Sequence, residues 1–224
     1  MFNRLNTSAF PQSTDFYIAE FEYVLQKITL CYKMMIDDGV KVQNSENLIR
    51  DKLLINYLKD NSIRNKIHLT QYLFDREVPE DNSIGRCDIK VQTQDTFTDT
   101  SAYFIIECKR LDSQNLKGIT GLNAKYISNG IMRFVNKQYS TNKGLCGMIG
   151  FVVEIMDISV NINNINYLLK SNFVCSNTLT ILTVANFIKD FDYQYYSEHK
   201  TSKSKKRIKL YHLMYDFSGN IKTS

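Results

Sequence analysis

Asp88, Glu107 and Lys109 are the residues of this chain whose types and spacing can do chemistry. Glu107 and Lys109 stand two apart in Glu107-Cys108-Lys109, at the end of an otherwise apolar run that begins at Ala102. Residues two apart on a strand share a face, so these two side chains project together, about 6–7 Å apart at the backbone. Two carboxylates suit a hard cation such as Mg²⁺ or Mn²⁺, and a lysine beside them can hold or deprotonate a water molecule. The combination suits metal-assisted attack of water on a phosphodiester.

Two neighbouring strands are predicted to position these residues. Residues 86–91 alternate in polarity, with Asp88 on the polar side. Residues 102–106 are almost wholly apolar, as in a strand that is buried on both faces. The polar segment 92–101 is long enough to join the two as antiparallel neighbours, which places Asp88 about 5 Å from the second strand. We therefore expect the two carboxylates and the ammonium to converge at one end of a sheet. The side chains expected on the apolar side of the first strand are Cys87, Ile89 and Val91.

Asp88 followed by Glu107-Cys108-Lys109 resembles the motif of the PD-(D/E)XK nuclease superfamily, the fold of many restriction endonucleases. The family's leading proline is replaced here by Cys87. The resemblance covers about residues 44–154, and it implies an α/β fold with an αβββαβ core, in which helices flank a mixed central sheet. It implies that Asp88, Glu107 and the main-chain carbonyl of Cys108 hold Mg²⁺ or Mn²⁺, with Lys109 positioning the attacking water. The implied activity is metal-dependent endonucleolytic cleavage of DNA, in restriction or defence against foreign DNA.

A helix ahead of the sheet carries a further acid. The pattern predicts this helix from Asn44 or Ser45 to about Asp60, with an inward stripe on which Glu46 also falls. An acid in the first turn of a helix commonly complements the helix dipole. In the resembling family, by contrast, a glutamate on the preceding helix often faces the metal. Both interpretations of Glu46 stay open, and we count it among the candidate catalytic residues. The inward positions of the stripe are Ile49, Leu53 and Tyr57.

A second helix is predicted after the Glu-x-Lys strand, from about Thr120 to Tyr139. Its expected core face is made by Ile127, Ile131 and Phe134. In nucleases of the resembling family, the helix at this place offers a polar side chain toward the scissile phosphate. The alternative is an ordinary solvated basic face. The candidates for contact with nucleic acid are Lys125, Tyr126, Arg133 and Lys137.

The C-terminal third contains a second basic region. A helix is expected near residues 160–170, a strand at 178–184 and a closing strand at 208–217, by periodicity and β-branching. The segment 199–209 holds six Lys or Arg residues and no acid. It is interpreted either as a disordered basic loop or as a loop that grips phosphates, with neighbouring tyrosines able to stack on bases. The candidates for contact with nucleic acid are Lys203, Lys205, Lys206 and Arg207.

The first predicted helix, from Thr14 to about Asp38, carries one apolar stripe. We expect a packing helix that ends at Gly39, with a dimer interface as the alternative. At 224 residues the chain is expected to be one nuclease-like domain, with a helical lead at 1–40, the core at 44–154 and a C-terminal strand extension at 155–224.

Composition narrows the class of protein. The net charge of +5 permits phosphate binding without establishing it. No run approaches 18 apolar residues, so no membrane span is expected, and the sequence after Met1 shows no signal peptide. The five cysteines are scattered and odd in number, which predicts neither a zinc site nor a disulfide framework and favours the cytoplasm.

Three classes of function follow. The first is the DNA endonuclease, for which a double-strand break would need two active sites and hence favours a homodimer. The second is a catalytically silent nucleic-acid-binding module with the same fold. The third is an interaction subunit of a larger defence complex, with the long first helix docking a partner.

Overall fold

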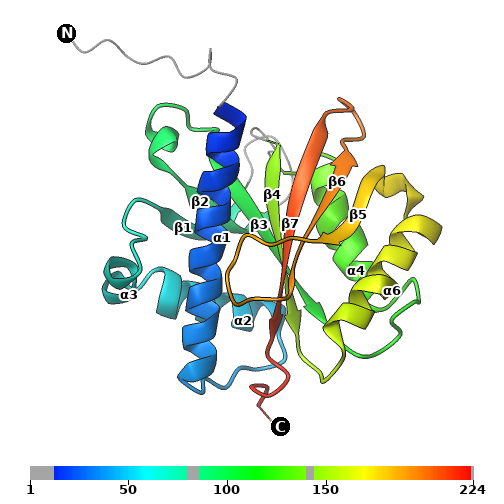
Figure 1. Ribbon diagram of the computed structural model, residues 1–224, viewed down its shortest axis with the longest axis horizontal. Helices are drawn as coiled ribbons and strands as arrows, with labels where there is room; N and C mark the ends of the chain where they lie inside the picture. The colour runs from blue at the N-terminus through cyan, green and yellow to red at the C-terminus, as the bar shows by residue number, and fades with distance from the viewer. Residues whose placement is uncertain (1–12, 80–85, 140–143, 223–224) are drawn as a thin grey trace.

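The computed structural model describes residues 13–79, 86–139 and 144–222. The described residues build a seven-stranded mixed sheet with helices on both faces (Figure 1). In chain order the strands are β1 (Leu73–Pro79), β2 (Arg86–Gln92), β3 (Tyr103–Leu111), β4 (Leu145–Val152), β5 (Thr178–Val184), β6 (Gln194–Lys200) and β7 (Arg207–Asp216). The α-helices are α1 (Ser13–Asp37), α2 (Glu46–Leu53), α3 (Asn61–Lys66), α4 (Leu122–Tyr126), α5 (Met132–Val135) and α6 (Ile158–Ser171). Two π-helices, η2 (Leu54–Leu58) and η4 (Ile127–Ile131), extend α2 and join α4 to α5, and the short 3₁₀ helices are η3 (Gln94–Phe97) and η5 (Val174–Ser176).

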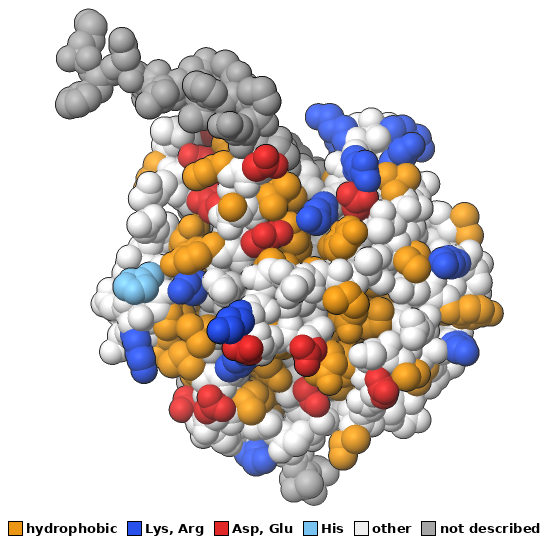
Figure 2. Space-filling view, in the orientation of Figure 1, with side chains coloured by type: hydrophobic (Ala, Val, Ile, Leu, Met, Phe, Trp, Pro, Cys, Tyr) orange, Lys and Arg blue, Asp and Glu red, His pale blue; other side chains and the backbone are white. Residues whose placement is uncertain are grey.

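The strand order is β1-β2-β3-β4-β7-β6-β5. The pairs β3–β4 and β4–β7 are parallel, and the other neighbours are antiparallel. The last strand in the sequence therefore lies inside the sheet, between β4 and β6. The sequence correctly predicts a strand here, but this strand is an interior strand of the sheet and not an edge strand. The C-terminal third supplies three of the seven strands, and Lys and Arg side chains gather over the end of its β6–β7 hairpin (Figure 2).

Between residues 44 and 154 the elements follow in the order α2, η2, α3, β1, β2, η3, β3, the α4–α5 segment and β4. Residues 67–72 connect α3 to β1. The side chain of Asp60 caps α3 by accepting the Ile63 N–H at 2.9 Å. Pro79, which lacks a donor for a strand partner, ends β1 at an edge of the sheet.

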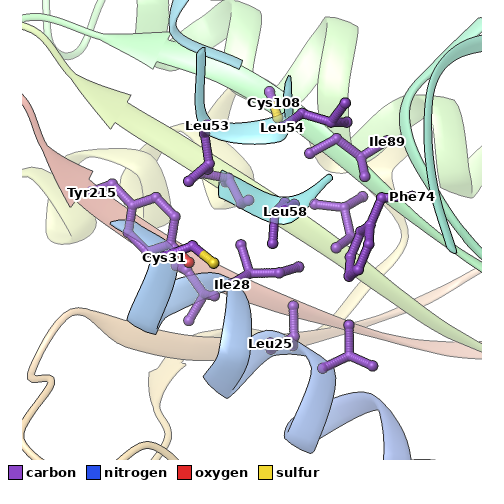
Figure 3. Packing of buried hydrophobic residues seen from close by; sticks show 14 of the residues in the cluster. Leu25, Ile28, Cys31, Leu53, Leu54, Leu58, Phe74, Ile89, Cys108 and Tyr215 are labelled. Atoms are coloured by element: carbon purple, nitrogen blue, oxygen red, sulfur yellow. The ribbon is translucent and has the colours of Figure 1, made fainter. Parts of the chain in front are cut away.

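The apolar stripe of α1 packs on the sheet (Figure 3). The N–H of Gly39, at a φ of 65°, donates to the carbonyl of Ile36 and ends the helix. A Cβ on Gly147 of β4 would lie 2.9 Å from Ile106 and 3.2 Å from Phe21, so the glycine lets α1 approach the strand closely. The packing interpretation of this helix is confirmed, and its buried stripe offers no surface to a second copy. The buried stripe residues are Phe21, Val24, Ile28, Cys31 and Met35.

Two apolar clusters form the core. The first lies between the sheet and α1, α2 and η2, and the second lies between the sheet and α4 to α6. Ile89 and Val91 of β2 belong to the first cluster, but Cys87 belongs to the second. The predicted alternation of β2 therefore fails at Cys87, beyond the point at which β2 and β3 stop pairing.

Across the described ranges, no helix combines the length and the apolar character needed to cross a membrane.

Candidate active site

The site lies where β2 and β3 separate. Their antiparallel pairing runs from Gln92 opposite Tyr103 to Ile89 opposite Ile106. One residue further along β2, a side chain replaces the main-chain hydrogen bonds between the strands, because Asp88 Oδ2 accepts the Cys108 N–H at 2.8 Å. A buried N–H needs an acceptor, and here a carboxylate supplies it. The Asp88 carboxylate is thereby fixed in the fork between the strands.

Glu107 and Lys109 reach the same fork from β3. The Lys109 Nζ lies 2.7 Å from Glu107 Oε1 and 3.8 Å from Asp88 Oδ2. All three residues are more than nine-tenths buried, and Glu107 is 0% exposed. The structure thus brings together the three side chains that the sequence singles out.

Glu46 joins them from the first turn of α2. Its Oε1 lies 2.9 Å from the Lys109 Nζ, and its Oε2 accepts the Arg110 N–H at 3.1 Å. Asn44 also accepts hydrogen bonds from the Arg110 side chain, which docks the start of α2 against the end of β3. Of the two interpretations of Glu46, the geometry favours the one in which the acid faces the site.

Arg50 is a site residue that the sequence interpretation missed. It follows Glu46 by one helical turn and is 1% exposed. Its Nη1 donates to Asp88 Oδ1 at 2.8 Å, and its Nη2 lies 2.7 Å from Asp51 and 3.0 Å from Glu77. A buried guanidinium needs such partners, because removing it from water is costly. The sequence signal that could have identified Arg50 was a basic residue four positions after Glu46, next to the inward-facing stripe of the same predicted helix.

Arg133 and Tyr139 hold the other carboxylate. The Arg133 Nη1 donates to Glu107 Oε1 and the Tyr139 hydroxyl donates to Glu107 Oε2, each at 2.7 Å. The π-helix η4 interrupts the predicted regular helix, which ends at Val135 rather than near residue 139. Arg133 therefore contacts a carboxylate in this structure, whereas the sequence left open a phosphate contact and a solvated basic face. Tyr139 had no predicted role.

Burial and charge oppose each other in the site. Burial and, after it, the charge of Asp88 raise the pKa of Glu107 to about 7, against the opposing effect of Lys109 and Arg133. Burial lowers the pKa of Lys109, but the surrounding carboxylates, Glu107 first, outweigh burial and raise the pKa above its ordinary value. Lys109 is therefore an ammonium. We define the site cluster as six residues that ion pairs join into one network, which continues through Arg50 to Asp51 and Glu77. The six are Glu46, Asp88, Glu107, Arg50, Lys109 and Arg133.

The donor set of the site fits a hard cation. Besides the carboxylates, the main-chain carbonyl of Cys108 points inward and accepts from the Lys109 Nζ at 2.6 Å. Carboxylate and carbonyl oxygens are the ligands that Mg²⁺ and Mn²⁺ prefer. Within the described part of the chain, however, no three His, Cys, Asp or Glu side chains are arranged to hold a metal ion as they stand. The ammonium of Lys109 lies among these oxygens instead.

The candidates for nucleic-acid contact on the α4–α5 segment separate into buried and exposed residues. Tyr126 is 0% exposed, and its hydroxyl lies 2.8 Å from His212 Nδ1. The prediction for Tyr126 is therefore wrong in this conformation, because a base has no ring surface to contact. Lys125 is exposed on α4, and Lys137 is exposed just beyond α5 at a φ of 56°.

The basic segment near residue 203 forms a hairpin turn. The Thr201 N–H donates to the Lys206 carbonyl at 2.9 Å, and the Ser202 N–H donates to the Val135 carbonyl at 2.8 Å. The turn is thus closed by its own hydrogen bonds and docked on the end of α5, near Lys137, unlike the disordered loop of the alternative interpretation. Arg207 pairs with Glu198. The turn's exposed lysines are Lys203, Lys205 and Lys206.

Comparisons of the chain with protein-family models, with curated proteins and with solved structures found no match.

Proposed function

We propose that this protein is a metal-dependent endonuclease that hydrolyses phosphodiester bonds of DNA. The observation that carries the proposal is the meeting of Asp88, Glu107 and Lys109 where β2 and β3 separate, with Glu46 facing them from α2. The order of elements around this fork is the one that the PD-(D/E)XK resemblance implies, and we place residues 44–154 in an αβββαβ core of that kind.

Each site residue has a role in this proposal. Asp88, Glu107 and the Cys108 carbonyl would hold Mg²⁺ or Mn²⁺, with Glu46 beside them. The ion supplies a lowered pKa for bound water and offsets negative charge on the phosphate. Lys109 orients the attacking water and stabilises the negative charge that develops on the phosphate oxygens.

The basic surface supports nucleic acid as the substrate class. Lys137 and the lysine-bearing turn docked on α5 are exposed, and the same segment carries Arg133 to the site. Lysines of this kind neutralise phosphates and release counterions. We infer that DNA lies along this surface, that the role is restriction or defence against foreign DNA in the cytoplasm, and that the protein acts as a homodimer or as a subunit of a defence complex.

The test is cleavage of plasmid and linear DNA with Mn²⁺ or Mg²⁺, with and without chelator. We expect metal-dependent cutting, reduced by at least about 10²–10³-fold in Glu107→Gln, by analogy with the loss of one preorganised charge. Glu22→Gln is the matched control. Glu22 lies on α1 and accepts a hydrogen bond from the Tyr211 hydroxyl at 2.7 Å, and the glutamine side chain keeps an oxygen that can accept it. Undiminished metal-dependent cutting by folded Glu107→Gln would remove this mechanism.

A second candidate function is favoured by the saturation of the site. Both oxygens of Asp88 and both of Glu107 already have partners, and each of the cluster's acids faces a cation. A structural ion cluster beside a basic surface would serve a catalytically silent nucleic-acid-binding or interaction subunit. A salt-dependent shift in DNA mobility, with no cutting under any metal condition, would favour this second function.

A further inference from the structure

The ammonium of Lys109 lies inside the oxygen set that is proposed to hold the metal. Its Nζ is 2.6 Å from the Cys108 carbonyl, 2.7 Å from Glu107 Oε1, 2.9 Å from Glu46 Oε1 and 3.8 Å from Asp88 Oδ2. These oxygens come from α2, β2 and β3, so the lysine joins three elements. Lys109 is 7% exposed, which leaves its charge little access to water.

A divalent ion would have to share these oxygens with a charge of the same sign. Arg50 and Arg133 already pair with Asp88 and Glu107 from the outside. Each acid of the site cluster already faces at least one of its cations, so a divalent ion would add two positive charges to oxygens that are already paired with cations. Like charges at contact distance in a poorly solvated site repel strongly.

We propose that the Lys109 ammonium and the divalent cation exclude each other from this oxygen set. In the metal-free protein Lys109 takes the cation's place and closes the site. For a divalent ion to bind, Lys109 would have to leave this oxygen set, and a phosphate group would give its ammonium a new partner. Metal affinity is therefore low in the free protein and is raised by nucleic acid, and by linkage the metal raises the affinity for nucleic acid equally. This inference rests on the proposed function, since it assumes that these oxygens hold a metal.

The first test is calorimetric titration with Mn²⁺ in the absence of nucleic acid. Lys109→Met, which removes the charge and keeps an unbranched side chain, is expected to bind Mn²⁺ at least tenfold more tightly than the wild-type protein. Lys125→Met is the control, because it makes the same change in net charge at an exposed position on α4. Equal or weaker binding by folded Lys109→Met, or no binding by either protein, overturns the proposal.

A second measurement needs no substitution at Lys109 and decides the matter if Lys109→Met fails to fold. In ¹⁵N-lysine-labelled wild-type protein, the buried Lys109 ammonium is expected to give a resonance distinct from those of exposed lysines. Titration with Mg²⁺ should abolish or shift this resonance and leave that of Lys125 in place. Persistence of the Lys109 resonance at its metal-free position in the Mg²⁺-saturated protein would overturn the proposal.

The two proposals fail separately. Metal-dependent cutting by the wild-type protein, combined with unchanged Mn²⁺ affinity in Lys109→Met, would leave the nuclease standing and refute the exclusion. Tighter Mn²⁺ binding by Lys109→Met, combined with no cutting by the wild-type protein under any metal condition, would refute the nuclease and leave the exclusion standing.

Discussion

Replacing Arg50 by methionine is expected to destabilise the fold far more than replacing a nearby exposed arginine. Arg50 is 1% exposed, and its removal leaves Asp88, whose side chain is 12% exposed, without its closest cationic partner. Breaking a buried ion pair by removing one partner costs about 3–5 kcal/mol. Asp88 keeps the Cys108 N–H at 2.8 Å and Lys109 at 3.8 Å, so we expect the lower end, about 3 kcal/mol.

Arg76→Met is the matched control for this substitution. Arg76 pairs with Asp51 at 2.5 Å, but its side chain is 48% exposed, and an exposed pair contributes only about 0–1 kcal/mol. Both variants lose one guanidinium and keep a side chain of similar length, so they differ chiefly in burial.

The assay is the free energy of unfolding from urea titration in the presence of chelator, with thermal melting as a check. A loss of about 3 kcal/mol in a chain of this size lowers the melting temperature by roughly 6–12 °C. A difference between Arg50→Met and Arg76→Met below about 1 kcal/mol would refute the reasoning, because it would mean that Asp88 does not depend on Arg50.

The other predictions concern pH, a hydroxyl and the basic turn. Burial lowers the pKa of His199 to about 4, so its stabilising contribution is complete above its unfolded pKa of about 6.5 and is lost as the pH falls toward 4. The stability advantage of the wild-type protein over His199→Gln should therefore shrink by about 2 kcal/mol between pH 7 and pH 5 in urea titrations, and a constant difference would contradict the assignment. Tyr139→Phe removes one hydrogen bond to buried Glu107 and should cost about 1.5–3 kcal/mol, whereas Tyr167→Phe at an exposed position should cost almost nothing by the same titration. Neutralising the lysines of the β6–β7 turn should weaken binding of a DNA duplex and reduce the slope of log affinity against log salt by up to about 2.7, and an unchanged slope would exclude contact. The substitutions are Lys203→Gln, Lys205→Gln and Lys206→Gln, with Lys66→Gln, Lys170→Gln and Lys189→Gln as exposed controls.

The sequence by itself determined the elements that carry the site. Alternation in 86–91 and the apolar run after Ala102 predict β2 and β3, because side-chain periodicity is a local property of the backbone. The change from apolar residues to Glu107 and Lys109 identifies the candidate catalytic residues for the same reason, because it is visible in the local sequence without knowledge of distant contacts. The helix that presents Glu46 follows from its stripe.

Only the tertiary structure decided which charges meet. Arg50 and Arg133 look like ordinary helical basic residues in the sequence, and their pairing with Asp88 and Glu107 depends on how α2 and α5 dock on the sheet. Tyr126 looks equally available, but the insertion of β7 beside β4 buries it against His212. Strand order and side-chain partners depend on contacts between residues far apart in the chain, which local periodicity does not encode. The position of Lys109 among the oxygens of three elements has the same origin, because α2, β2 and β3 create it only when they pack together.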